Sequence, residues 1–224
     1  MSFTRSTATI LAKELRTEFR SRELLGTTVV FVLIVIVLFS FTFNPTSSES
    51  RRFGPGLLWI AFLFAGSLML QPSFLREQTN DTLSALRLAP IDPFSILAGK
   101  MAANFLFLLL VELILLPVFA VLYNIAILPV LAPLVLVLVL GTIGLATTGT
   151  VFSAVAAQAR LRELLLPLLL LPVLAPVLIA STEATAGILR DPSELSLVWL
   201  TFLTAFDVVF LTAAWLFGEY LLEE

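Results

Sequence analysis

The sequence predicts an all-α polytopic membrane protein with six transmembrane helices. Hydrophobic residues make up 59% of the 224 residues and charged residues only 13%, whereas soluble domains carry roughly half apolar and a quarter charged residues. The mean hydropathy is +1.05. Apolar runs without any charge, such as 27–43, reach the length that a helix needs to cross a bilayer. Together these three observations exclude a soluble fold.

The apolar runs divide the chain into six expected spans with short connections. Each span is on the order of 20 residues long, as the thickness of the hydrocarbon layer requires. Too little of the chain remains for a second soluble domain of ordinary size, so we expect a single transmembrane domain over residues 1–224. The expected spans are 26–43, 56–74, 98–122, 129–153, 164–181 and 197–218.

The segment before the first span, residues 1–25, is predicted to contain an amphipathic helix that lies in the membrane interface. Leu11, Leu15 and Phe19 recur every four residues, which places them on one face of a helix. Arg16 and Arg20 occupy other faces, where they can contact anionic lipid headgroups. The alternative is a simple basic flank that sets the orientation of the first span.

The distribution of Lys and Arg predicts that both termini face the cytoplasm. With the N-terminus inside, only three of the 13 basic residues fall on the outer side, which is the positive-inside pattern. Five aromatic residues near the ends of spans are expected at the headgroup level. They are Trp59, Tyr123, Trp199, Trp215 and Tyr220.

The fifth span carries three prolines, Pro167, Pro172 and Pro176. Each of them lacks a backbone donor and crowds the preceding helical turn. A straight helix is therefore not expected. We expect either a kink or a break near Pro172, with the following stretch folding back at the outer face.

Small residues at helical spacing mark the fourth span. Gly149, Ser153 and Ala157 follow one another every four residues, and Gly141 and Gly144 precede them. Such a stripe lets two helices approach closely. The sequence leaves open whether the partner helix belongs to the same chain or to another subunit.

The largest connection between spans, residues 75–97, is a candidate loop for docking a partner. Asn80 or Asp81 can cap a short helix, on which Leu83 and Leu86 share one face, and a proline ends it. A short amphipathic helix of this kind fits a groove on a partner protein. The alternative is a connector that packs only on its own bundle.

The chain lacks the side chains that many catalytic and metal sites use. It has no His and no Cys, which excludes thiol chemistry, thiolate metal sites and the commonest metal ligand. It also lacks the G-x-x-x-x-G-K-[ST] loop that cradles nucleotide phosphates. We therefore expect no catalytic residue, no metal site and no ATPase activity in this chain, and no nucleic-acid partner.

Two carboxylates stand inside expected spans, Glu112 in the third and Asp207 in the sixth. A charge at mid-span costs on the order of 2.5–3.5 kcal/mol on insertion scales, so each side chain should face the interior of the bundle. They are either elements of a polar or proton-linked pathway, or protonated carboxyl groups that are hydrogen-bonded between helices.

The order and spacing of several short motifs resemble the CcmB family, the membrane permeases of the haem exporter in cytochrome c maturation. The likeness covers nearly the whole chain, including the six-span layout. The motifs are Gly-Pro-Gly-Leu-Leu-Trp at 54–59, Arg76-Glu77, Thr-Leu-x-x-Leu-x-Leu-x-Pro at 82–90, Lys100, the Leu-rich and Pro-bearing stretch 164–181, and the basic segment 13–20.

This resemblance implies an ABC-type membrane subunit in the cytoplasmic (inner) membrane. It would act as a homodimer with two copies of a separate ATP-binding subunit, CcmA, and with the haem-handling subunits CcmC and CcmD. The candidate docking loop would then be a coupling helix against the ATPase, flanked by the N-terminal helix. The coupling residues implied in this chain are Arg76, Glu77, Asp81, Leu83, Leu86 and Arg87.

The composition bears separately on haem. Haem iron is normally held by His, Cys, Met or Tyr, and only Met69, Met101, Tyr123 and Tyr220 remain as internal candidates. We therefore expect no cofactor to be bound by this chain alone. ATP would bind the ATP-binding partner, and a partner subunit would supply the axial ligands of haem.

Three other functions stay open on the sequence. One is a permease of the same six-helix ABC exporter class that handles a lipid, a polysaccharide or a drug. Another is an ion-coupled secondary transporter that uses Glu112 and Asp207 as its relay. The third is a non-transporting membrane scaffold whose conformational changes release a partner complex.

Overall fold

The computed structural model describes residues 3–42, 48–74, 92–157, 162–190 and 193–223, and within them it contains helices and no strand. The predicted all-α class is therefore confirmed. In chain order the helices are α1 (Phe3–Ser21), α2 (Glu23–Thr42), α3 (Ser48–Leu70), α6 (Pro93–Leu122), the short 3-10 helix η1 (Leu128–Val130), α7 (Leu131–Ala157), α8 (Arg162–Ile188) and α9 (Leu197–Glu223).

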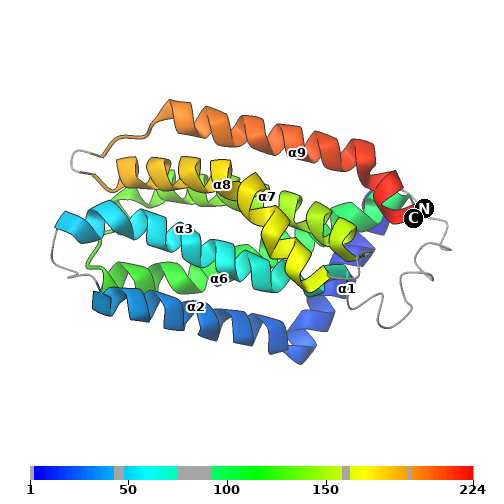
Figure 1. Cartoon of the computed structure of the whole chain (residues 1–224), viewed down its shortest axis with the longest axis horizontal. Coiled ribbons are helices and arrows are strands. Elements are labelled where there is room, and N and C mark those ends of the chain that lie inside the picture. The colour runs from blue at the N-terminus through cyan, green and yellow to red at the C-terminus, as the bar shows by residue number, and fades with distance from the viewer. Residues whose placement is uncertain (1–2, 43–47, 75–91, 158–161, 191–192, 224) are drawn as a thin grey trace.

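Six of the described helices are long and apolar enough to cross a membrane, namely α2, α3, α6, α7, α8 and α9. Figure 1 shows them side by side in alternating directions, with α1 across one end of the bundle. The start of α1 and the end of α9 lie at that same end. The predicted six-span layout is thus confirmed. The fifth spanning helix, α8, continues past the predicted end at residue 181, because Ala184, Thr185 and Ile188 are still buried in the bundle.

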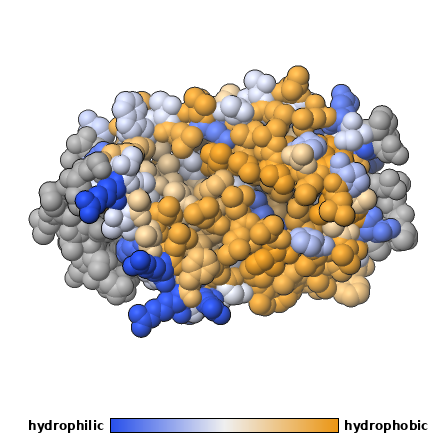
Figure 2. Space-filling view, turned by 180° about the vertical axis from the view of Figure 1, so that it is seen from behind, coloured by the Kyte–Doolittle hydropathy of each residue, from blue (hydrophilic) through white to orange (hydrophobic). Residues whose placement is uncertain are grey.

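The surface of the bundle has the polarity of a membrane protein. Figure 2 shows hydrophobic side chains over the middle of one face and hydrophilic side chains toward its two ends. Many large apolar side chains are exposed, such as Leu38, Leu113 and Val209. A lipid environment would cover this surface, since exposed apolar area of this extent is rare on soluble monomers.

The central helix is α7, which packs against α3, α6, α8 and α9. Its small residues make this possible. A Cβ added at Gly141 would collide with the Trp59 ring, and one added at Gly149 would collide with Leu70. Ser153 donates a hydrogen bond of 2.8 Å to the carbonyl of Leu70. The small-residue stripe thus serves packing within the chain.

Helix α8 is continuous from Arg162 to Ile188, so of the two expected alternatives the break near Pro172, with a segment folding back, does not occur. Figure 1 shows that α8 changes direction along its length, which confirms the expected kink. A proline removes one backbone donor but leaves the rest of the helical ladder intact, and no water competes for it in a membrane. Val177, Ala180 and Ala184 are fully buried and hold the second half of α8 in the bundle.

Two of the five aromatic residues expected at the headgroup level are buried between helices. Trp59 is fully buried, and its indole N–H donates a 3.0 Å hydrogen bond to Thr185 of α8. Tyr123 is buried too, and its hydroxyl donates to the Ile36 carbonyl at 3.3 Å. Their polar atoms find partners on neighbouring helices, as buried Trp and Tyr side chains usually do.

Candidate functional site

Helix α1 packs along the first part of α6 and closes one end of the bundle. Its buried residues are Ser6, Ile10 and Glu18, and their spacing of four and eight residues defines one helical face. At Gly99 of α6 the two helices come so close that an added Cβ would lie 2.7 Å from the Cβ of Ile10. Glycine is therefore what allows α1 to dock.

The predicted apolar stripe of α1 lies beside this buried face. Leu11 and Leu15 are half-buried and pack against the hydrophobic core, while Phe19 is 52% exposed. Arg16 and Arg20 are exposed. The expected amphipathic helix is present, but the face that docks on α6 is a different one, with two acidic positions in it. The sequence pattern missed that face because most of it is polar.

Lys100 of α6 is the charged centre of this region. Its side chain is only 1% exposed, and its Nζ donates a 2.9 Å hydrogen bond to Oε1 of Glu14 in α1. The same ammonium donates to the backbone carbonyl of Ser73, just beyond α3, and lies 4.8 Å from the centre of the Phe74 ring, a cation–π distance. One buried cation thereby joins α1, the end of α3 and α6.

The charge on Glu14 is stabilised by this contact. Burial disfavours the ionised carboxylate, but the adjacent Lys100 ammonium and, to a smaller extent, Lys13 outweigh that effect, so the pKa of Glu14 lies below its ordinary value. Lys13 donates to the same oxygen, Oε1, at 3.3 Å, from a side chain that is 44% exposed. Glu14 therefore pairs one buried and one solvent-facing cation.

Glu18 holds the corner between α1 and α2. Its side chain is 1% exposed, and Oε1 accepts a 2.8 Å hydrogen bond from the backbone N–H of Leu25 in the first turn of α2. Arg22 has a φ of 54° and makes the turn between the two helices. A carboxylate at the N-terminal end of a helix satisfies a free donor and is favoured by the helix dipole.

Asn104 continues the polar cluster into the bundle. Its amide donates to the Ser73 hydroxyl at 3.2 Å and to the Thr150 hydroxyl of α7 at 2.9 Å. Together with Lys100, it fastens the segment after α3 to both α6 and α7. Buried polar groups that are all partnered in this way favour one defined arrangement of helices.

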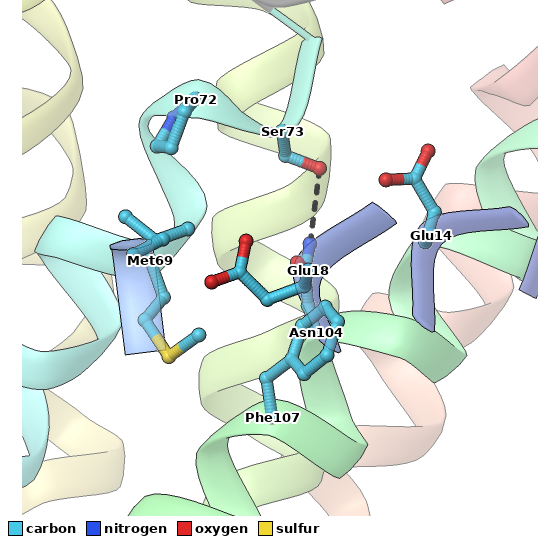
Figure 3. A pocket seen from close by; sticks show the side chains of 8 residues that line it. Glu14, Glu18, Met69, Pro72, Ser73, Asn104 and Phe107 are labelled. Atoms are coloured by element: carbon cyan, nitrogen blue, oxygen red, sulfur yellow. Dashed lines mark hydrogen bonds between the residues drawn. The ribbon is translucent and has the colours of Figure 1, made fainter. Parts of the chain in front are cut away.

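A small cleft of about 20 Å³ opens between Glu14, Glu18, Met69, Ser73 and Asn104, among other residues. Figure 3 shows the Glu18 carboxylate pointing into the cleft, beside the hydrogen bond between Ser73 and Asn104. This volume has room for on the order of one water molecule and is far too small for haem. Among the described residues no group of three or more acidic side chains could hold a metal ion.

A larger cleft of about 250 Å³ lies between α3 and α8. It is mainly apolar, with Thr182 and Glu183 as polar lining residues. None of its lining residues is of a type that normally ligates a haem iron. The other lining residues are Gly56, Trp59, Ile60, Leu178 and Ile179.

The two intramembrane acids face the interior, as predicted, but they do not lie together. Glu112 is 3% exposed, and Oε1 lies 2.6 Å from the Thr142 hydroxyl of α7. Asp207 is 5% exposed and packs against Gly144 of α7, and neither of its oxygens has a hydrogen-bond partner among the described residues. Positions 142 and 144 are about 200° apart around a helix, so the two acids contact different sides of α7.

All six coupling residues expected in the loop, from Arg76 to Arg87, lie outside the described residues. The loop was predicted over 75–97, but α6 begins at Pro93, so the last five of those residues belong to a helix, which Asp92 caps and whose first turn suits a proline. The structure shows what flanks the remaining part of the loop, namely Ser73 and Phe74 before it and the start of α6 after it. The residues that organise this flank are Lys100, Glu14, Glu18 and Asn104. The available signal for Lys100 was a lone cation within an apolar helix, which is costly unless it is paired.

Comparison with known proteins gives consistent matches over most of the chain. The family model described as CcmB protein matches residues 5–217. The heme exporter protein B of Pseudomonas aeruginosa is 35% identical over 197 residues, which cover 88% of each chain. The heme exporter protein B of Haemophilus influenzae is 32% identical over 82% of this chain and 83% of that protein. The protein of the same name from Rhodobacter capsulatus is 31% identical over 78% and 79%.

Proposed function

We propose a function for this chain from one premise: it belongs to the CcmB family, whose model matches residues 5–217. The proposed function is that of the membrane subunit of a haem exporter complex of the ABC type, which couples ATP hydrolysis to haem delivery for cytochrome c maturation. The names of the curated relatives carry the haem assignment. They favour it over a lipid, polysaccharide or drug as the substrate.

On this proposal the chain itself does not hydrolyse ATP. Its sequence has no phosphate-binding loop, and six spans take up most of its length. A separate CcmA-like subunit would hydrolyse ATP, and CcmC- and CcmD-like subunits would handle haem. Because the chain has no His and no Cys, a partner would supply the axial ligands of the haem iron.

The end of the bundle that carries α1 and the Lys100 cluster is proposed to face the cytoplasm of an inner-membrane protein. The positive-inside pattern of the sequence supports this orientation, and α1 contributes exposed Arg5, Arg16 and Arg20 at that end. The 75–97 loop begins at this same end, since Ser73 and Phe74 contact Lys100 there. An ATP-binding subunit would dock on this face of the dimer.

The carboxyl groups of Glu112 and Asp207 are proposed to be structural rather than a proton relay. The two acids contact different sides of α7, through Thr142 and past Gly144. A relay needs groups within hydrogen-bond reach of one another or of a chain of waters. This separation favours a coupling subunit over an ion-coupled secondary transporter.

Co-purification with the candidate ATP-binding subunit tests the proposal. The loop variants Leu83→Glu and Leu86→Glu should release that subunit, because a buried carboxylate on the docking face is strongly unfavourable. Ser84→Glu is the matched control, since it adds the same charge away from that face and should leave the complex intact.

Two further readouts follow on the purified complex. ATP turnover should require this chain, and haem absorbance should be retained only when a CcmC-like subunit is present. If no ATP-binding subunit associates with the unmodified chain, the ABC assignment fails.

A further inference from the structure

Both flanks of the proposed coupling loop are attached to α1. On the incoming side, Ser73 and Phe74 contact Lys100, which pairs with Glu14 of α1. On the outgoing side, the Phe94 ring stacks on Phe3 of α1, with ring centroids 5.7 Å apart. Helix α1 is therefore linked to the residues on both sides of the loop, through Lys100 on the incoming side and directly on the outgoing side.

The outgoing flank is itself well defined. Asp92 caps α6, because its carboxylate accepts a 2.9 Å hydrogen bond from the backbone N–H of Phe94. From there α6 continues into Gly99, where Ile10 of α1 makes its closest approach, and then into Lys100. The ring contact, the glycine contact and the ion pair thus follow one another along a single helix–helix interface.

The far end of α1 is attached to the first span. Glu18 accepts a hydrogen bond from the Leu25 N–H of α2, and both groups are buried. The Phe19 ring meets Phe107 of α6 edge-on, with centroids 6.5 Å apart. A displacement of α1 must therefore change contacts with α2 and α6 as well as with the flanks of the loop.

An ion pair is an expensive way to hold these helices together if holding them is its whole purpose. Replacing a buried pair with apolar residues of similar size is often neutral or stabilising. An ammonium that donates to a carboxylate and to a carbonyl and also lies over a ring fixes three elements relative to one another. A leucine cannot do this, because its apolar contacts are not directional.

We infer that Lys100 and Glu14 are positioning residues that lock the incoming flank of the coupling loop, Ser73 and Phe74, to α1, so that this flank, α1 and the start of α6 move as one unit during the ATP cycle. This inference rests on the proposed function, because it assigns the loop to an ATP-binding partner. Without the ion pair, the ATP-binding subunit would still bind and hydrolyse ATP. A smaller part of its conformational change would be transmitted to the membrane-spanning helices.

The experiment uses the complete complex with its ATP-binding and haem-handling subunits. Lys100→Met removes the ammonium and keeps most of the side-chain volume. Glu14→Gln is a milder variant that keeps an oxygen acceptor, and Lys13→Gln is the control, since it removes an exposed cation one residue away. For each variant three quantities are measured: recovery of the ATP-binding subunit, ATP turnover, and the yield of haem-loaded cytochrome c per ATP hydrolysed.

Lys100→Met and Glu14→Gln should retain the ATP-binding subunit and its turnover, while the yield per ATP falls about tenfold, within the usual range of coupling between sites. Lys13→Gln should match the unmodified chain. The charge reversal Glu14→Lys with Lys100→Glu should recover part of the yield that Lys100→Glu alone loses.

The inference is overturned if Lys100→Met and Glu14→Gln deliver the unmodified yield per ATP, or if yield falls only in proportion to the amount of folded chain. Either result leaves the ABC assignment standing. Loss of the ATP-binding subunit from the unmodified complex would instead remove the proposed function on which the inference depends.

Discussion

The Nζ atom of Lys100 lies 2.9 Å from Oε1 of Glu14 and joins two helices whose paired residues are 86 positions apart. The lysine side chain is 1% exposed and the glutamate side chain 18% exposed, so one partner is enclosed while the other reaches the edge of the protein. This difference in burial determines how much unfolding free energy each substitution should remove.

Removing only the cation should destabilise the chain. Lys100→Met leaves Glu14 partly buried and takes a donor from the Ser73 carbonyl, so we expect a loss of about 2–4 kcal/mol in unfolding free energy, slightly below the range for fully buried pairs. Thermal unfolding in detergent micelles measures this loss. The double variant Glu14→Gln, Lys100→Met should recover part of it, and equal losses in the single and double variants would contradict the pairing.

The Glu14 contact also predicts a dependence of stability on pH. Because the pKa of Glu14 is lowered in the folded chain from an ordinary value of 4.5, its contribution is fully present well above pH 4.5. That contribution is lost as the pH falls through the lower, folded-state pKa. Between about pH 6 and pH 3, the unfolding temperature of the unmodified chain should therefore drop more than that of Glu14→Gln. Parallel curves for the two proteins would show that Glu14 gains nothing from Lys100.

Glu112 is expected to be protonated in the folded protein, because a charged carboxylate inside a membrane-spanning helix is costly and its Oε2 has no hydrogen-bond partner among the described residues. The Thr142 hydroxyl lies 2.6 Å from Oε1 of Glu112 and 2.7 Å from the Leu138 carbonyl. If its single proton goes to the carbonyl, which cannot donate, the carboxyl group must donate to Thr142.

Substitutions at Glu112 follow from this arrangement. Glu112→Gln keeps a donor in place and should change the unfolding free energy by less than about 1 kcal/mol, whereas Glu112→Ala should cost about 2–4 kcal/mol through lost packing and hydrogen bonding. Infrared spectroscopy should detect a protonated carboxyl band that Glu112→Gln removes. A glutamine variant as unstable as the alanine variant would indicate a charged Glu112.

The close packing of α7 on α3 predicts a strong effect of one methyl group. In Gly141→Ala the new Cβ would meet the rigid Trp59 ring and would lie 2.8 Å from the Ser181 hydroxyl oxygen, so we expect a loss of about 1–3 kcal/mol from overpacking. Gly26→Ala is the control, since nothing lies within 4 Å of the added Cβ. That substitution should be neutral or stabilising by about 0.5–1 kcal/mol in a helix. Similar unfolding temperatures for the two variants would mean that α7 and α3 are not in close contact.

The six spans were predictable from the sequence because length and apolarity are local properties of a segment. A run of roughly 20 uncharged residues has few alternatives to a membrane-spanning helix, whatever its neighbours are. The resemblance to the CcmB family was visible in the same way, in the order of short motifs along the chain. The six-span layout and the family were both confirmed.

The contacts of the aromatic residues and the choice between the two proline alternatives were harder to predict from the sequence. The partner of the Trp59 N–H is Thr185, 126 residues later, which no local pattern indicates. Pro172 was expected to kink or break α8, and the helix bends without breaking, with Val177 and Ala180 of its second half buried in the bundle. In both cases the packing of the helices against one another decides the outcome.

The candidate site shows most clearly which features the sequence predicts and which only the tertiary structure decides. The sequence alone established a polytopic membrane protein of this family, with an amphipathic helix before its first span. It could not indicate that the face of α1 carrying Glu14 and Glu18 docks on the bundle, because acidic residues are normally exposed. Only the tertiary structure brings Lys100 and the Leu25 N–H to those carboxylates, and burial of a charge depends on such a partner, which no local pattern encodes.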